Sequence, residues 1–265
     1  MLSKRALGST GLNISALTLG TVKFGRNTAV KYPEKFELPD LKTCGYLLDL
    51  AYDLGFNIID TAPAYGLSEQ RLGEVLKKRK HQDWLICTKA GEFYNLKTEK
   101  SKFYFSVKAV TKSLENSLKV LGRDAVDIFL LHSDGNDLDI LNNQDLLSCI
   151  YDFKIAGKIR SHGISSKTVS GGLLAAELLD VIMVTHNLNY NKELAVINKA
   201  HALNKGVLIK KGLDSGNFKN SPAHNIDAGI KFVLNTPGVS SLVIGSINKN
   251  HLIANANYSC VNTLF

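Results

Sequence analysis

The sequence lacks the long apolar run that a membrane-spanning helix requires. It also lacks the apolar core of a secretion signal, because glycine, serine, threonine and asparagine interrupt residues 8–13 directly after the basic start at Lys4 and Arg5. We therefore expect no membrane association and, by default, a cytoplasmic location.

Cysteine is scarce and unpaired in the sequence. The four cysteines, Cys44, Cys87, Cys149 and Cys260, lie far apart and form no CxxC pair, which argues against a zinc site. A chain of this length without a secretion signal also has no need of a disulfide framework. We expect reduced thiols, mostly in the core, and no bound metal.

The sequence also lacks an excess of acidic residues, since its formal net charge is +8. A basic chain can attract nucleic acid. Here, however, the basic residues are scattered, and the basic run over residues 77–80 is typical of a solvated helix end. We expect no nucleic-acid partner and suggest that the positive charge attracts a small anion, such as a cofactor phosphate.

What the sequence does contain fits one globular unit. It has 265 residues, of which 45% are hydrophobic and 21% charged. This length suits a single α/β barrel. Because no linker, low-complexity tract or composition change interrupts it, we expect a single domain over residues 1–265, either a monomer or a small homo-oligomer.

Short apolar segments alternate with amphipathic ones along the whole chain. Near-continuous apolarity predicts parallel strands covered on both faces, at residues 16–19, 56–60, 84–88, 126–131, 161–165, 181–185, 206–209 and 241–244. Helical spacing predicts helices at residues 47–54, from 68, and at 106–121, 144–155, 169–179, 193–203, 228–234 and 252–257. Ser68 and Ser106 are the expected N-caps of the second and third of these helices.

This alternation predicts an α/β fold, namely a closed (β/α)8 TIM barrel. An open doubly wound sheet is the competing fold, but its GxGxxG fingerprint after the first strand is absent. Residues 8–11 have the turn chemistry of a short N-terminal β-hairpin. Long loops are expected at residues 21–40, 92–102, 133–142 and 214–225, and the last three follow barrel strands, so we expect them on the active face.

Polar side chains follow three successive predicted strands. Asp60 ends the second strand and Tyr65 lies in the next loop, while Lys89 and His132 follow the third and fourth strands. Each has an ordinary explanation alone, as a turn cap, a packed aromatic, a loop lysine or a core histidine. Because the carboxyl ends of barrel strands meet at one mouth, their joint occurrence favours one active site.

These residue types suit the reduction of a carbonyl group, which needs a hydride on carbon and a proton on oxygen. A tyrosine pKa near 10 is high for this task, so we expect the ammonium of Lys89 to lower the pKa of Tyr65. Asp60 would keep that ammonium charged, and His132 would hydrogen-bond the carbonyl oxygen. Since no side chain supplies hydride, a reduced cofactor is required.

These motifs identify a family resemblance over nearly the whole chain. The sequence resembles the aldo-keto reductases at residues 5–12, 19–21, 60–66, 68–73, 88–89 and 127–132. The resemblance implies a (β/α)8 barrel that binds NADPH in extended form. It also implies the reversible reduction of aldehydes or ketones to alcohols, with Asp60, Tyr65, Lys89 and His132 as catalytic residues and a small carbonyl compound as substrate.

The resemblance also implies a set of cofactor-binding residues: Gly20, Thr21, Ser165, Ser166, Lys210, Leu213, Ser215, Gly245, Ser246, Lys249 and Asn255. Ser165 and Ser166 would bind the nicotinamide carboxamide, although Ser166 stands where the family usually has asparagine and Met183 where it usually has glutamine. Lys210 stands where a residue packs on the nicotinamide, frequently an aromatic one. The backbones of Leu213 and Ser215 would follow the pyrophosphate.

The segment at residues 244–252 resembles the loop and helix start that hold the adenosine 2′-phosphate. A helix N-terminus with Ser246 and Lys249 suits an anion, although Gly245 and His251 stand where many members carry a basic residue. Asn255 matches the adenine-binding residue. NADP is therefore the expected cofactor, with NAD as an alternative.

Two other functions stay open. The unusual cofactor contacts also fit a cofactor-binding regulatory or sensing subunit with little turnover, because fold alone does not determine function. A barrel isomerase or aldolase that uses Lys89 as a Schiff-base amine is a further alternative, although it leaves Tyr65 and His132 without a role.

Overall fold

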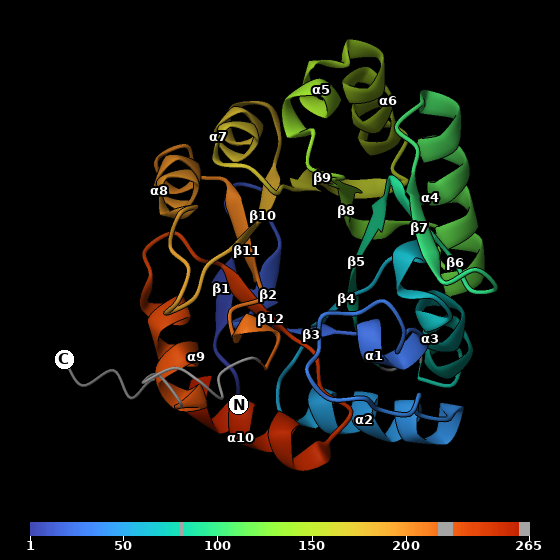
Figure 1. Cartoon of the computed structure of the whole chain (residues 1–265), viewed down its shortest axis with the longest axis vertical. Helices are drawn as coiled ribbons and strands as arrows, with labels where there is room; N and C mark the ends of the chain where they lie inside the picture. The colour runs from blue at the N-terminus through green and yellow to red at the C-terminus, as the bar shows by residue number, and fades with distance from the viewer. Residues whose placement is uncertain (80–81, 217–224, 260–265) are drawn as a thin grey trace.

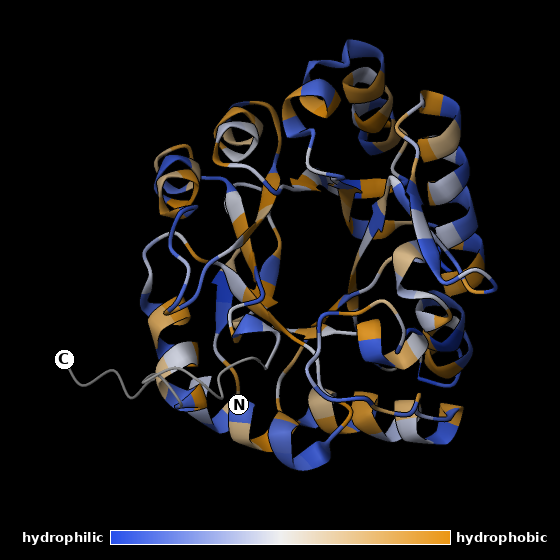
Figure 2. Ribbon diagram, in the orientation of Figure 1, coloured by the Kyte–Doolittle hydropathy of each residue, from blue (hydrophilic) through white to orange (hydrophobic). Residues whose placement is uncertain are grey.

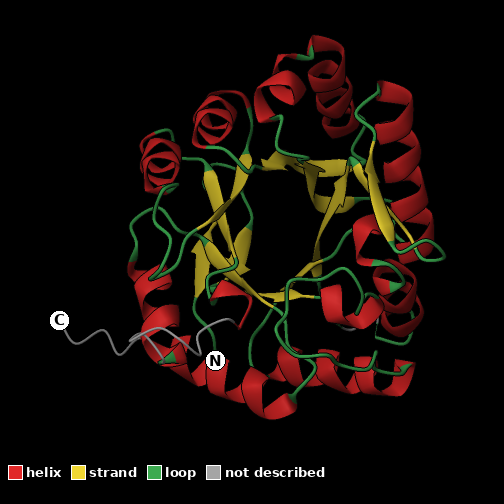
Figure 3. Ribbon diagram, in the orientation of Figure 1, coloured by secondary structure: helices red, strands yellow, loops and turns green. Residues whose placement is uncertain are grey.

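Eight parallel strands close into a barrel in the computed structural model, which describes residues 1–79, 82–216 and 225–259. Neighbouring strands follow the order β10-β11-β12-β3-β4-β5-β8-β9, and the strands form the inner ring in Figure 3. They are β3 (Leu17–Gly20), β4 (Ile58–Asp60), β5 (Leu85–Ala90), β8 (Val126–His132), β9 (Ile159–Ser165), β10 (Val181–Thr185), β11 (Gly206–Lys210) and β12 (Ser241–Ile244). The predicted (β/α)8 fold is confirmed.

Helices surround this ring (Figure 1) and carry both hydrophobic and hydrophilic residues (Figure 2). They are α1 (Val22–Gly25), α2 (Leu41–Asp53), α3 (Ser68–Leu76), α4 (Val107–Leu121), α5 (Asp137–Asn142), α6 (Gln144–Ile155), α7 (Val169–Leu178), α8 (Leu194–Ala202), α9 (Ile226–Asn235) and α10 (Lys249–Ser259). Within the described ranges, none of them is both long and apolar enough to cross a membrane.

The predicted N-terminal β-hairpin is also confirmed. Strands β1 (Lys4–Ala6) and β2 (Asn13–Ser15) pair antiparallel. Gly8 lies in the turn with a φ of +52°, and a Cβ there would overlap the backbone of Lys205. Leu7, Leu12 and Ile14 of the hairpin are buried and join the hydrophobic cluster of the barrel interior, so the hairpin contributes to this cluster.

Two apolar clusters organise the barrel because successive strand residues face opposite sides. Ile58, Cys87 and Ile128 belong to the interior cluster. Their chain neighbours Ile59 and Ile86 belong to the larger cluster that includes the helices. This alternation fixes which residues at the strand ends face the interior.

Several local predictions need correction. Ser68 is the first residue of α3 rather than its N-cap; Leu67 takes that position without a capping side chain, because the Ser68 hydroxyl donates to Thr21 instead. Ser106 does cap α4, by accepting a hydrogen bond from the Ala109 amide. The segment at 21–40 also follows a barrel strand, β3.

The expected loop at 92–102 forms a second hairpin, in which β6 (Glu92–Asn95) pairs with β7 (Lys100–Phe103). The Asn95 side chain accepts from the amides of Lys97 and Thr98, which stabilises the turn. The expected loop at 133–142 contains α5. Part of the expected loop at 214–225 lies outside the described residues.

Cysteine follows the expectation where the structure describes it. Cys44 and Cys87 are buried free thiols and Cys149 is partly buried, while Cys260 lies outside the described residues. Among the described residues, no group of three or more histidine, cysteine, aspartate or glutamate side chains is arranged to hold a metal ion.

Candidate active site

Strand alternation brings three polar side chains to the carboxyl end of the barrel, which we call the mouth. Asp60, Lys89 and His132 lie two, two and four positions after Ile58, Cys87 and Ile128, which face the interior. They come from adjacent strands β4, β5 and β8. Even spacing keeps all three on the interior side, as strand geometry requires.

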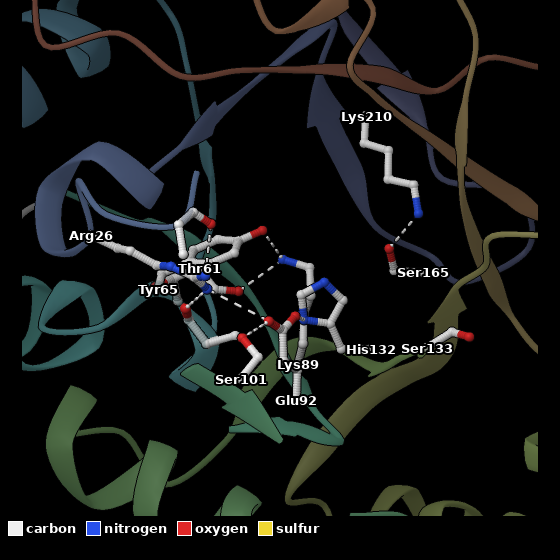
Figure 4. Close-up of polar contacts among 12 residues, drawn as sticks. Arg26, Thr61, Tyr65, Lys89, Glu92, Ser101, His132, Ser133, Ser165 and Lys210 are labelled. Atoms are coloured by element: carbon white, nitrogen blue, oxygen red, sulfur yellow. Dashed lines mark hydrogen bonds and ion pairs between the residues drawn. The ribbon is translucent and has the colours of Figure 1, made fainter. Parts of the chain in front are cut away.

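Asp60, Lys89 and Tyr65 form a connected cluster there. The Lys89 Nζ donates to Asp60 Oδ1 at 2.5 Å, to Tyr65 Oη at 2.9 Å and to the Thr61 carbonyl oxygen at 3.0 Å. Tyr65 Oη donates to Asp60 Oδ2 at 3.2 Å. Figure 4 shows the Lys89 ammonium directed at the phenol. The structure thus brings together three of the four predicted catalytic residues through direct hydrogen bonds.

Burial and the ion pair with Asp60 act in opposite directions on the pKa of Lys89, whose side chain is 1% exposed. Burial is the largest single effect and would lower its pKa, but the charge and hydrogen bond of Asp60, together with smaller contributions from Tyr65 and Cys87, outweigh it, so the pKa of Lys89 lies above its ordinary value. Lys89 therefore stays an ammonium. A charged amine is a poor nucleophile, which argues against its use in a Schiff base.

The position of Tyr65 follows from a tight turn. Pro63–Tyr65 forms one turn of 3-10 helix, η1. Gly66 ends it with a φ of +64°, and a Cβ there would overlap the Gly25 carbonyl oxygen. Because only glycine fits at that position, the turn delivers Tyr65 to the mouth in one orientation.

The pKa of Tyr65 differs from the expectation. Burial, and then the negative charge of Asp60, raises the pKa of Tyr65 above its ordinary value, and the opposing charge of Lys89 offsets only part of this effect. The prediction of a lowered pKa was wrong because it left out the desolvation of the phenol. Tyr65 is a neutral hydroxyl in this structure and keeps its proton at neutral pH.

His132 lies beside this cluster. Its ring meets the Tyr65 ring edge-on, with 6.3 Å between centroids. Burial, followed by the positive charges of Lys89 and Lys210, holds the pKa of His132 well below its ordinary value. The imidazole is therefore neutral, and its Nδ1 lies 3.2 Å from Glu92 Oε2.

Sequence reasoning missed two charged residues at the mouth. Glu92 opens the β6–β7 hairpin next to His132, and Arg26 lies in the segment after β3. The guanidinium of Arg26 stacks on the Tyr94 ring at 3.7 Å from its centroid. Glu92 could have been found from its position only three residues after Lys89, directly beyond a strand end.

A third missed residue, Glu69, supports the strand that carries Lys89. Glu69 of α3 is buried and accepts hydrogen bonds from Thr88 of β5 at 2.6 Å and from Ser117 of α4 at 3.2 Å. Thr88 faces outward because it lies between the inward-facing Cys87 and Lys89. Glu69 thus links the strand that carries Lys89 to two helices.

Lys210 and Ser165, two of the predicted cofactor residues, lie apart from Tyr65 in the view of Figure 4. The Lys210 ammonium donates to Ser165 Oγ at 2.9 Å and to the Ser166 carbonyl oxygen at 2.5 Å. Burial lowers the pKa of Lys210 to about 7. Lys210 thus contacts both residues that the sequence assigns to the nicotinamide carboxamide.

The remaining predicted cofactor residues lie at neighbouring strand ends. Gly20 ends β3 beside Gly245, which follows β12. The hydroxyl of Thr21 is engaged by the barrel, since it donates to the Asp60 carbonyl oxygen at 2.9 Å and accepts from Ser68. Its contact with a cofactor stays a prediction.

The other predicted cofactor residues lie before and after residues 217–224, which are outside the described ranges. Leu213 packs against the core, and Ser215 adopts a φ of +55° in the 3-10 turn η2 (Asp214–Gly216). Ser246 accepts from the Asn248 amide ahead of α10, Lys249 begins that helix at the surface, and Asn255 is buried within it.

One observation tests whether this region suits a nicotinamide cofactor. Ser166 Oγ is buried and has no hydrogen-bond partner among the described residues. Such a group is costly unless something binds it. A carboxamide could supply that partner, so the donor set fits the cofactor that the sequence implies.

Comparisons with known proteins agree with this geometry. The family model described as the aldo/keto reductase family matches residues 16–228. A solved structure from Pseudomonas aeruginosa, assigned to the aldo-keto reductases, is 44% identical, with a TM-score of 0.86 over 97% of this chain and 93% of that one.

Curated relatives match over a shorter range. L-Galactose dehydrogenase from Arabidopsis thaliana is 33% identical over 61% of this chain and 47% of its own length. An uncharacterised oxidoreductase from Bacillus subtilis is 30% identical over 62% of this chain and 48% of its own length. The match therefore spans about half the length of these two relatives. Because the family model covers most of the sequence and the barrel carries the expected cluster, the chain belongs to the aldo-keto reductase family.

Proposed function

We propose that this protein is an oxidoreductase that uses NAD(P)H to reduce aldehydes or ketones to alcohols, reversibly. The observation that supports this most directly is the hydrogen-bonded cluster of Tyr65, Lys89 and Asp60 at the barrel mouth. Barrel enzymes carry their active sites at this end. His132 completes the predicted set of four at the same mouth.

The residues divide the chemistry between them. Tyr65 is a neutral hydroxyl and supplies the proton to the substrate oxygen. Lys89 stabilises the negative charge that develops on the phenol oxygen, because its ammonium lies 2.9 Å away. Asp60 holds that ammonium in place. His132 faces the substrate oxygen from the neighbouring strand.

The cofactor would lie toward β9, β11 and β12. When bound, a reduced nicotinamide supplies the hydride that no side chain can supply. Ser165 and Ser166 would hold the carboxamide, while Ser246 and Lys249 at the start of α10 would hold the 2′-phosphate. Lys249 is the feature that favours NADP over NAD.

Relatives suggest the substrates to test. One relative is named D-threo-aldose 1-dehydrogenase and another NADH-specific methylglyoxal reductase, at 26% and 27% identity. We propose small aldehydes, including oxoaldehydes and aldoses, as the substrate class. The match covers only 59% and 52% of these relatives, so their substrates serve as a starting panel.

The test is a set of turnover assays with NADPH and NADH against methylglyoxal, aromatic aldehydes and aldoses, together with cofactor titrations. We expect cofactor oxidation with at least one carbonyl and tighter binding of NADPH than NADH. Tight cofactor binding with negligible turnover across the panel would favour the regulatory subunit. Absence of binding to either cofactor would refute the proposal.

A further inference from the structure

The β6–β7 hairpin places a carboxylate against the histidine of the site. Glu92 Oε2 lies 3.2 Å from His132 Nδ1, and both side chains are largely buried, at 15% and 17% exposed. At this separation Nδ1 still has no aligned hydrogen bond to Glu92 or to any other described residue. Figure 4 shows the two side chains next to each other. No other part of the proposed mechanism uses Glu92.

Glu92 is held where it is by its own contacts. Its Oε1 accepts from Ser101 Oγ across the hairpin at 2.6 Å and lies 3.6 Å from the Arg26 guanidinium. Arg26 is fixed in turn, because it donates to the carbonyl oxygens of Thr28 and Ala64. Ala64 belongs to the turn that positions Tyr65. These contacts therefore fix the position of the Glu92 carboxylate at the mouth.

The charges around His132 come from several elements. Lys89 on β5, Lys210 on β11, Lys167 after β9 and Arg26 after α1 all act on it as positive charges. Together with burial they disfavour the imidazolium. A neutral imidazole has one N–H, and its partner decides which nitrogen carries the hydrogen.

We propose that Glu92 is a positioning residue that holds His132 in the tautomer with its hydrogen on Nδ1. An ionised carboxylate accepts hydrogen bonds and donates none, so the nitrogen facing it carries the hydrogen. The 3.2 Å separation is within reach of a hydrogen bond after a small rotation of the ring. Nε2 is then left with a lone pair.

This assignment has a consequence that rests on the proposed function. The lone pair of Nε2 accepts a hydrogen bond from the hydroxyl of an alcohol, but it cannot donate one to a carbonyl oxygen, which differs from the role that the sequence predicted for His132. In the ground state, His132 thus recognises the alcohol partner of the reaction, while Tyr65 is the neutral donor available to the carbonyl partner. Glu92 thereby biases the free site toward binding alcohols.

The direct test is the tautomer itself, measured by nitrogen-15 NMR on protein labelled at histidine nitrogens. His132→Asn identifies the resonances of His132. We expect a protonated Nδ1 and a bare Nε2 in the unmodified protein. We expect Glu92→Gln to lose or reverse this preference, because the glutamine amide can donate to Nδ1. Glu115→Gln, on the exposed face of α4, is the matched control and should leave the resonances unchanged.

A hydrogen found on Nε2 in the unmodified protein would overturn the proposal, as would an unchanged tautomer in Glu92→Gln. This measurement needs no turnover, so its result stands even if the proposed reductase activity fails. If Glu92→Gln unfolds, Ser101→Ala removes one partner of the carboxylate and should weaken the tautomer preference in the same direction.

Kinetics supply the second readout. In Glu92→Gln we expect the KM of an alcohol to rise about tenfold relative to the KM of its matching carbonyl, which corresponds to the loss of one strong hydrogen bond. The Kd of the cofactor should stay the same. An equal change in both KM values would indicate a purely structural role and contradict the proposal.

Discussion

At the scale of single residues, the proton on Tyr65 is the property on which the proposed reduction depends. Burial and Asp60 raise the pKa of this phenol, and Lys89 only partly offsets them. The hydroxyl is consequently protonated throughout the physiological pH range. In the proposed reaction, Lys89 would stabilise the phenolate as it forms, which is where stabilisation accelerates a reaction.

Replacing Tyr65 with phenylalanine tests this role. We expect Tyr65→Phe to lower kcat about 100-fold to 10,000-fold, the usual range for a general acid. The Kd for NADPH should stay within about twofold, because the phenol is assigned to the substrate side. Steady-state kinetics and a cofactor titration measure both values. Turnover close to that of the unmodified protein would contradict the assignment.

Lys210 gives a prediction about pH. Since burial lowers its pKa to about 7, the side chain is an ammonium below pH 7 and a neutral amine above it. The ammonium repels the positively charged nicotinamide ring of NADP⁺ but not the uncharged dihydronicotinamide ring of NADPH. The affinity for NADP⁺ relative to NADPH should therefore rise, by about tenfold, as the pH increases from 6 to 8.

Titrations of both cofactors at several pH values measure this ratio. Lys210→Met should abolish its pH dependence. The matched control is Lys249→Met, which should weaken both NADP⁺ and NADPH equally and leave the pH dependence in place. A ratio that is constant with pH in the unmodified protein would show that Lys210 does not contact the nicotinamide.

At the scale of elements, close packing of helices sets the positions of the strands that carry the site. Gly73 of α3 lies against the backbone of Val120 near the end of α4, where a Cβ would overlap the Val120 carbonyl oxygen. The same α3 carries Glu69, which binds Thr88 beside Lys89. Packing at Gly73 is therefore coupled to the site.

Gly73→Ala should force α3 and α4 apart and lower the free energy of unfolding by about 2 kcal/mol, a typical cost of overpacking. Urea denaturation measures the change. Glu74→Ala, one position further along α3 and exposed, should change stability by less than about 0.5 kcal/mol. Equal stability of both variants would mean that the helices separate without cost.

The helices and strands also show which parts of the fold could be predicted from the sequence. The barrel strands and most helices were predicted because apolar periodicity and burial coincide there. The β6–β7 hairpin was missed because its polar and apolar residues do not alternate as they do in a core strand. The hairpin also forms its own sheet, outside the barrel. Glu92 lies in that hairpin, so its contact with His132 could not be predicted.

For the candidate site, the sequence predicted which side chains meet but not how they act on one another. The spacing of Asp60, Lys89 and His132 along their strands was sufficient to place them at one mouth. The pKa of Tyr65 was predicted in the wrong direction, because desolvation depends on the surrounding packing. Likewise, the contact of Lys210 with Ser165 depends on barrel geometry that joins β9 and β11 across β10.

At the scale of the whole molecule, we propose that the chain unfolds as one domain. The barrel closes through the pairing of β3 with β12, which joins the start of the chain to its end. The sole tryptophan, Trp84, is buried, donates to Gln82 and meets the Tyr52 ring of α2 edge-on. Its fluorescence therefore reports packing at one point of this closed structure.

Denaturation followed by Trp84 fluorescence and by far-ultraviolet circular dichroism should give coincident, single transitions, as expected for one cooperative unit. Trp84→Phe, followed by circular dichroism alone, shows whether the probe itself alters stability. Separate midpoints for the two signals would indicate independently unfolding parts and contradict the single domain.

Around the barrel, the strands that carry the predicted catalytic residues are followed by those that carry most of the proposed cofactor residues. Asp60, Lys89 and His132 stand on three consecutive strands. The residues proposed to hold the cofactor come mainly from β9 and the elements after it, beginning directly beside β8. We therefore expect substitutions at Ser246 and Lys249 to alter the preference between NADP and NAD without displacing Tyr65.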